Sequence, residues 1–212
     1  ERFKYFAGLS LGEYSALACN GAISFEDALR ILQKRGRFMQ EAIPNGEGGM
    51  LVVLGISSEE IQKILDKAND TYECYIANDN SKSQVVLSGL IKDIDLLSKD
   101  LESKKIKNIK LNVSSPFHCK YMKSASNKMT SSINNLKITK LNKPIISNVT
   151  AKEAYSPEQI KTLLISQIEK KVRWLESVEY MINNGIKNFV EIGPGKVLSG
   201  LIKRINKNVI IK

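Results

Sequence analysis

Gly8-Leu9-Ser10-Leu11-Gly12 is the stretch that decides the fold of this 212-residue chain. The mostly apolar residues 3–7 before it predict a buried strand, and residues 13–20 after it predict a helix. A strand that turns through Gly-x-Ser-x-Gly into a helix is typical of a nucleophile elbow. Gly8 and Gly12 would leave room around the strained turn, and the backbone N–H of Leu11 would face an oxyanion formed when Ser10 attacks a carbonyl. Five-residue patterns also arise by chance, so an ordinary glycine-rich turn with a surface serine is the alternative.

The composition is typical of a soluble globular protein, with 42% hydrophobic and 25% charged residues and no apolar run near the length of a membrane span. The net charge of +10 favours acidic partners. The lysines are scattered and not interleaved with aromatic residues, which disfavours a nucleic-acid binder. Three cysteines without metal-ligand spacing favour a reducing compartment and predict no metal site. Because the chain begins at Glu1 and soon enters the elbow strand, we expect a piece whose N-terminal segment is missing.

Residues 47–113 differ in pattern from the rest of the chain. A break rich in proline and glycine at 44–49 precedes them. They predict the order strand, helix, strand, strand, helix, strand over 50–56, 58–68, 72–77, 84–88, 90–104 and 107–113, with a polar loop at 78–83. This βαββαβ order is ferredoxin-like and predicts an inserted small subdomain. Outside it, we expect helices over 25–42, 120–136, from 157, over 172–183 and from 196, and strands over 144–149 and 189–192.

His118 is the only histidine, and a serine nucleophile needs a base. It lies in a proline-flanked loop just after the predicted insert, which would place it where the two parts of the chain meet. A histidine with a purely structural role is the alternative. No acidic residue is marked as the third member of a Ser–His–Asp triad, which counts against an ordinary esterase.

Arg35 is the other residue with possible chemistry. It falls within the spacing of the apolar face of the predicted helix 25–42. A guanidinium directed inward needs an anion and can bind a substrate carboxylate through two hydrogen bonds. From periodicity alone, a solvated arginine is the simpler interpretation.

Several spaced motifs together resemble the malonyl-CoA:acyl carrier protein transacylases. The similarity covers essentially the whole chain in unbroken order, and its matching segments are residues 8–17, 21–42, 78–89, 116–119 and 191–198. The resemblance implies an α/β fold in two subdomains. Residues 1–46 and 114–212 would form an α/β-hydrolase-like large subdomain with a parallel sheet, lacking its N-terminal part. Residues 47–113 would form the ferredoxin-like small subdomain.

The resemblance also implies a role for each site residue. Ser10 would be acylated, the Leu11 N–H would stabilise the oxyanion, His118 would act as general base and then acid, and the backbone carbonyl of Gln167 would orient His118. On the substrate side, Arg35 would pair with the malonyl carboxylate, Phe117 resembles the malonyl-selecting form of the family, and Asn80 belongs to a matched substrate-binding segment.

The activity implied is transfer of a malonyl group from malonyl-CoA to the phosphopantetheine thiol of an acidic acyl carrier protein, for fatty acid synthesis. We expect no cofactor or metal, no nucleic-acid or membrane partner, and a monomer in the cytoplasm or in a plastid-type organelle such as an apicoplast. Two departures stand against full activity. Leu9 replaces the family's histidine, and the N-terminal motif whose glutamine would supply a second oxyanion donor is absent. The alternatives are a serine hydrolase or thioesterase, and a catalytically impaired fragment that binds carrier protein.

Overall fold

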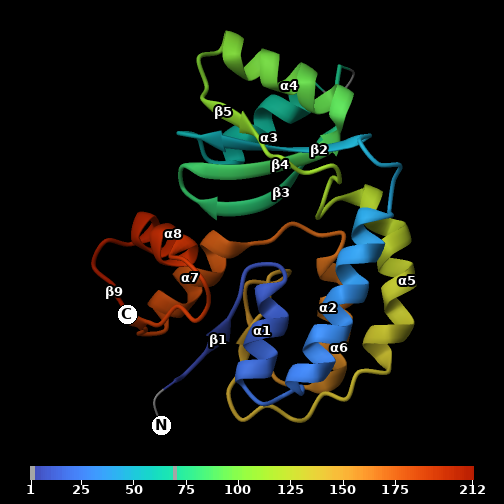
Figure 1. Cartoon of the computed structure of the whole chain (residues 1–212). Coiled ribbons are helices and arrows are strands. Elements are labelled where there is room, and N and C mark those ends of the chain that lie inside the picture. Colours follow the sequence, from blue (N-terminus) through green and yellow to red (C-terminus); the bar gives the residue numbers. More distant parts are fainter. Residues whose placement is uncertain (1–2, 69–70) are drawn as a thin grey trace.

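The structure is a computed structural model that describes residues 3–68 and 71–212. It is a mixed α/β arrangement in which a four-stranded sheet with two helices lies above a larger, mainly helical part (Figure 1). The helices are α1 (Gly12–Cys19), α2 (Phe25–Gln40), α3 (Ser58–Lys67), α4 (Ile91–Ser103), α5 (Lys123–Asn134), α6 (Pro157–Gln167), α7 (Trp174–Asn183) and α8 (Val197–Ile205), with one 3₁₀ turn, Lys120–Met122. The strands are β1 (Phe6–Ala7), β2 (Gly48–Leu54), β3 (Cys74–Ser81), β4 (Gln84–Leu90), β5 (Asn108–Lys110), β6 (Ile145–Ile146), β7 (Glu153–Ala154), β8 (Asn188–Phe189) and β9 (Ile210–Ile211).

The four-stranded sheet is antiparallel and has the order β3-β4-β2-β5. Because side chains alternate along a strand, each strand presents two faces. Residues such as Leu51 and Leu87 point to one face and form a fully buried core with α3 and α4. Met50 and Val86 point to the opposite face, where Phe117 packs against them. The sheet is therefore covered on both faces, and the second face lies towards the loop that carries His118.

The β3–β4 connection corrects one expectation from the sequence. A polar loop was predicted over 78–83, but β3 continues to Ser81 and only residues 82–83 turn. The polar side chains of Asn78, Asp79 and Asn80 are buried on this strand. Their burial follows from packing, because the segment before α7 pairs with β3 through Asp79 N–H to Val172 O at 2.9 Å and Val172 N–H to Ala77 O at 2.8 Å. Val172 is thus strand-paired, and the helix predicted from residue 172 begins at Trp174.

The larger part contains two small sheets. In the first, of order β1-β6-β7, β1 and β6 are parallel whereas β6 and β7 are antiparallel. The second is the parallel pair β8–β9. The expected parallel sheet is therefore limited, in the described residues, to two parallel strand pairs. The sequence patterns missed the two-residue strands β7 and β9.

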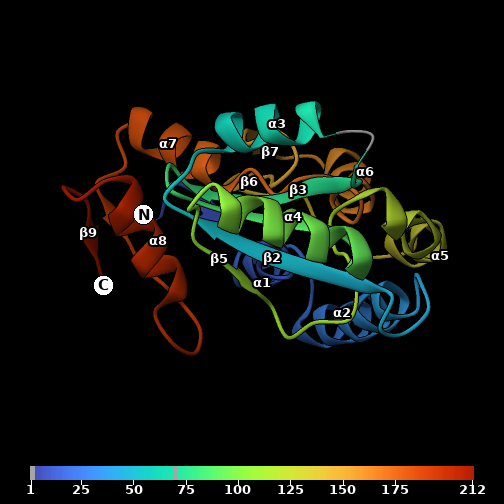
Figure 2. The same cartoon turned by 90° about the horizontal axis from the view of Figure 1, so that it is seen from above.

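Two apolar cores support the larger part. One is enclosed by α1, α2, α5 and α6 and includes the fully buried Tyr14, Leu17 and Met129. The other lies around α7 and α8 and includes Val178 and Leu201. Figure 2 shows α7 and α8 at one end of the four-stranded sheet and α5 near the other. Among the described helices, none has both the length and the apolar character needed to cross a bilayer.

Candidate active site

Ser10 occupies a tight turn between β1 and α1. Its φ of +54° lies in the left-handed region, which L-residues seldom adopt, and this is the backbone geometry of a nucleophile elbow. Gly8 is required there, since a Cβ on it would lie 1.9 Å from the carbonyl oxygen of Gly12. A Cβ on Gly12 would meet nothing within 4 Å. The close approach that the motif predicted therefore depends on the first glycine and not on the second.

The structure brings Ser10 and His118 together across 108 residues of sequence. Ser10 Oγ lies 2.8 Å from His118 Nε2, and His118 Nδ1 lies 2.8 Å from the backbone carbonyl oxygen of Gln167. Because a carbonyl can only accept, Nδ1 carries the proton and Nε2 is free to accept from the serine hydroxyl. Burial, together with the positive charge of Arg35, lowers the pKa of His118 to about 4. The imidazole is therefore neutral at pH 7, as a general base must be.

Arg35 points into the site and not into solvent, so the simpler interpretation from its periodicity is wrong. Its side chain is buried, and its Nη2 donates at 3.0 Å to both Ser10 Oγ and Gln167 Oε1. The guanidinium carbon lies 5.8 Å from the centre of the Tyr14 ring. Burial lowers the pKa of Arg35. Its Nε–H has no hydrogen-bond partner among the described residues.

The side chain of Gln167, at the end of α6, connects these groups. Its Nε2 donates to the backbone oxygen of Ser10 at 2.9 Å and to Glu13 Oε2 at 2.6 Å, while its Oε1 accepts from Arg35. Sequence reasoning anticipated only the backbone carbonyl of this residue. A fully buried glutamine with every amide group paired holds Ser10, Arg35 and His118 in fixed relative positions.

Glu13 and Asn148 belong to the same network, and sequence reasoning missed both. Asn148 Oδ1 accepts from the Ser10 backbone N–H at 2.7 Å, and Asn148 Nδ2 donates to Gly8 O at 2.8 Å. The Asn148 N–H in turn donates to Glu13 Oε2 at 3.3 Å. A carboxylate directly after the elbow was the available signal for Glu13, whereas nothing in the sequence marked Asn148.

The remaining predicted residues lie at different distances from this network. Leu11 is exposed, is the residue before α1, and its backbone N–H donates to no described residue. Phe117 is half-buried between the helical core and the second face of the four-stranded sheet.

Asn80 lies on β3, and within the described residues no hydrogen bond joins it to Ser10, His118 or Arg35. Its Oδ1 is buried without a partner there. Leu9 packs against the apolar core around α7 and α8.

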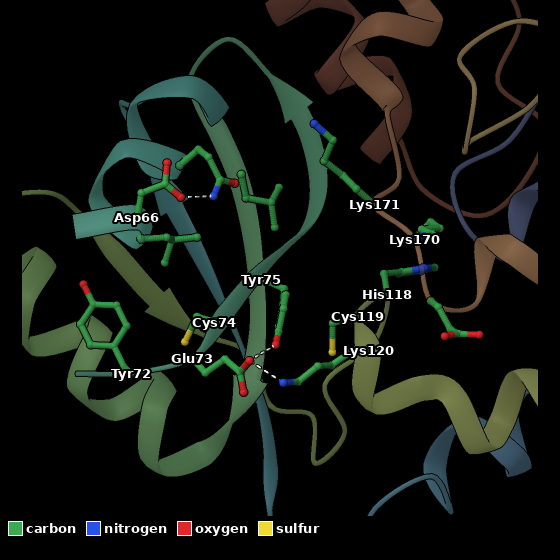
Figure 3. A pocket seen from close by; sticks show the side chains of 14 residues that line it. Asp66, Tyr72, Glu73, Cys74, Tyr75, His118, Cys119, Lys120, Lys170 and Lys171 are labelled. Atoms are coloured by element: carbon green, nitrogen blue, oxygen red, sulfur yellow. Dashed lines mark hydrogen bonds and ion pairs between the residues drawn. The ribbon is translucent and has the colours of Figure 1, made fainter. Parts of the chain in front are cut away.

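A cavity of about 530 Å³ lies on one side of His118 (Figure 3). Its walls come from α3, the start of β3, residues 118–120 and residues 169–171. Glu73 bonds to both Lys120 and Tyr75 at its edge. Ser10 and Arg35 do not line this space. It therefore lies beside the imidazole and does not contain the nucleophile.

Comparison with known proteins agrees with this geometry. The family model for the acyl transferase domain matches residues 2–210. The malonyl CoA-acyl carrier protein transacylase of Bacillus subtilis (strain 168) is 42% identical over 207 residues, which are 97% of this chain and 65% of that protein. The chain thus spans about two thirds of the length of this relative.

Solved structures show the same likeness. The malonyl CoA-acyl carrier protein transacylase from Coxiella burnetii has a TM-score of 0.95 at 37% identity, covering 100% of this chain and 67% of that one. A type II PKS acyl-carrier protein in complex with its malonyl-transacylase contains a chain with a TM-score of 0.94 at 36% identity, covering 100% of this chain and 69% of that one. A part-buried serine–histidine pair on an elbow and a family match over nearly every residue lead to one conclusion: the chain belongs to the acyl transferase domain family.

Proposed function

We propose that this chain carries the catalytic site of a malonyl-CoA:acyl carrier protein transacylase, which supplies malonyl groups for fatty acid synthesis. The observation that supports this most is Arg35, a buried guanidinium bonded to the Ser10 hydroxyl oxygen and holding an unpartnered Nε–H. A buried donor without an acceptor is costly, and a substrate carboxylate would supply the acceptor. A site that binds an acyl group bearing a carboxylate fits malonyl better than acetyl.

In the proposed reaction, His118 Nε2 takes the Ser10 hydroxyl proton as Oγ attacks the malonyl thioester carbon. The Leu11 N–H donates to the oxyanion of the tetrahedral intermediate. The carbon–sulfur bond then breaks, and His118 returns its proton to the CoA thiolate. A phosphopantetheine thiol next gives its proton to His118 and attacks the malonyl-serine ester. The carbon–oxygen bond to Ser10 breaks, His118 returns the proton to Ser10 Oγ, and the new thioester is formed. Gln167 O keeps Nδ1–H in place throughout, so that no acidic third residue is needed.

We further propose that Phe117 and Asn80 contribute to substrate binding. Phe117 lies next to His118 in sequence and packs on both the helical core and the four-stranded sheet, which suits a wall that limits acyl size. The buried, unpartnered Oδ1 of Asn80 suits a polar contact to the acyl donor. Leu9 cannot donate a hydrogen bond, so any acyl contact made by a histidine at this position is lost.

The architecture is proposed as two subdomains. Residues 1–46 and 114–212 form an α/β-hydrolase-like large subdomain, and residues 47–113 form a ferredoxin-like small one; residues 1–2 and 69–70 lie outside the described part. The strand order β3-β4-β2-β5 with α3 and α4 on one face supports the ferredoxin-like assignment.

The proposed partners are malonyl-CoA and an acidic acyl carrier protein, and the active species is proposed to be a monomer. The complex of a carrier protein with its malonyl-transacylase, described above, supports this partner for a chain of the same fold. The three unpaired cysteines support a reducing compartment, for which we propose the cytoplasm. Bacillus subtilis and Coxiella burnetii are bacteria and lend no support to the plastid alternative.

Intact-mass measurement after mixing the chain with malonyl-CoA tests the proposal directly. A malonyl adduct of about 86 Da on the wild type, absent in Ser10→Ala, is the expected result of covalent catalysis. Carrier protein should then remove the adduct and become malonylated. Loss of the adduct to water at the same rate without carrier protein would indicate a hydrolase or thioesterase. Absence of any adduct would indicate a non-catalytic carrier-protein-binding fragment.

A further inference from the structure

Glu13 is a buried carboxylate that the reaction above does not use. Its side chain, on the first turn of α1, is 1% exposed. Its Oε2 accepts from Gln167 Nε2 at 2.6 Å and from the Asn148 N–H at 3.3 Å. Burial raises the pKa of Glu13 to about 7, although both hydrogen bonds and the charge of Arg35 oppose this rise. Burying such a group is costly unless it is well paired, so its position calls for an explanation.

Glu13 is the nearest of the acceptors that face the Gln167 side-chain amide. The Gln167 NH₂ group donates to its two nearest acceptors, Glu13 Oε2 and the backbone oxygen of Ser10, while Asn148 Oδ1 lies farther away at 3.4 Å. Reversing the amide would place its oxygen against both acceptors and its NH₂ against the Arg35 guanidinium, which only donates. The observed orientation places Oε1 on Arg35 Nη2, and the same Nη2 lies 3.0 Å from Ser10 Oγ.

We infer that Glu13 is a positioning residue for acyl transfer, which acts by accepting the hydrogen bond of the Gln167 amide and so holding the Arg35 guanidinium against Ser10. The inference rests on the proposed function, because Arg35 is the group proposed to bind the malonyl carboxylate. Glu13 touches neither substrate nor reacting atoms, and its effect passes through Gln167. Its role depends on being an acceptor and not on its charge.

Two substitutions separate the acceptor from the rest of the side chain. Glu13→Met keeps a similar volume but removes the acceptor, whereas Glu13→Gln keeps an oxygen that can accept from Gln167. Asp93→Asn is the matched control, since Asp93 is a buried acid on α4 outside the network. Thermal unfolding of all three variants establishes that they are folded at the assay temperature.

Malonyl and acetyl loading of Ser10 provide the functional measurement, because acetyl has no carboxylate for Arg35. Glu13→Met should lower kcat/KM for malonyl loading by about tenfold, which corresponds to the free energy of roughly one hydrogen bond. It should lower kcat/KM for acetyl loading much less. Glu13→Gln and Asp93→Asn should stay close to the wild type. In an Arg35→Ala background, Glu13→Met should not change the malonyl-to-acetyl ratio further. Equal losses for both acyl groups, an undiminished effect without Arg35, or a Glu13→Gln variant as impaired as Glu13→Met would overturn the inference.

A substrate-free measurement distinguishes this inference from the proposed function. The side-chain amide signals of Gln167 in a ¹H–¹⁵N NMR spectrum, identified by their absence in Gln167→Met, report the orientation directly. In the wild type and in Glu13→Gln, these signals should lie downfield of those of a solvent-exposed glutamine, and their protons should exchange slowly with water. In Glu13→Met they should lose both properties. If the wild type forms no malonyl-serine but the amide signals behave as expected, the proposed function fails and the positioning by Glu13 stands. Unchanged amide signals in Glu13→Met would overturn the positioning itself.

Discussion

At the scale of single residues, Arg35 is the proposed determinant of acyl selectivity. Arg35→Ala removes the buried guanidinium that donates to Ser10 Oγ. We expect malonyl loading to fall by about 100-fold or more, because a charge-assisted pair to the carboxylate is lost, and acetyl loading to rise, because no unpaired charge is left in the site. Rates of acyl-serine formation from the two CoA esters measure both changes. A parallel fall for malonyl and acetyl would contradict the assignment.

Glu13 gives a prediction about stability and pH. Its pKa is about 7 in the folded chain against an ordinary value of 4.5, so the folded state favours the protonated form and loses stability as pH rises from about 4.5 through 7. Arg35, Gln167 and Asn148 are the groups that act on it. Glu13→Gln cannot ionise, and so its stability relative to the wild type should increase by up to about 3 kcal/mol between pH 4.5 and pH 8.

Urea unfolding of both proteins at several pH values measures this difference. His118 has the opposite behaviour, since its lowered pKa costs stability as pH falls from 6.5 towards 4. It is present in both proteins and therefore cancels in the comparison. A difference between the two proteins that does not change with pH would show that Glu13 is not protonated on folding.

At the scale of elements, the β1–α1 elbow depends on Gly8. Gly8→Ala would place a Cβ 1.9 Å from a backbone carbonyl oxygen, and backbone atoms on both sides would have to move. We expect a loss of about 4 kcal/mol or more in the free energy of unfolding, together with loss of Ser10 acylation. Gly36→Ala on α2 is the matched control, as its Cβ meets nothing within 4 Å, and alanine should raise stability by about 0.5–1 kcal/mol. Chemical denaturation and intact mass distinguish the two variants, and equal stability would contradict the elbow geometry.

Elements of ordinary length were predictable because their patterns are local. The capping side chains of Ser24, Ser57 and Ser156 accept from backbone N–H groups at the starts of α2, α3 and α6, close to where the sequence placed these helices. The end of β3 was not predictable from local composition. Its polar residues looked like a loop, but they pair with β4 on one side, and Val172 pairs with them on the other from nearly a hundred residues away.

At the scale of the whole molecule, the net charge of +10 predicts how the chain meets its proposed partner. Attraction between a basic enzyme and an acidic carrier protein is long-ranged and screened by salt. We expect kcat/KM for malonyl transfer to carrier protein to fall by about tenfold between low and physiological ionic strength. Transfer to pantetheine, an uncharged thiol, is the control and should change little. Equal salt dependence for both acceptors would show that the charge does not serve association.

The sequence by itself determined the elbow at Ser10, the single histidine that could serve it, and the order of strands and helices along residues 47–113. Each of these depends on local features: glycine at a strained turn, one candidate base, and short apolar runs between helical segments. Only the tertiary structure decided that Arg35 faces inward and that Glu13, Asn148 and the Gln167 side chain bind one another. The physical reason is that buried polar groups must find partners. Those partners lie 132, 135 and 154 residues apart in sequence, where no periodicity can reveal them.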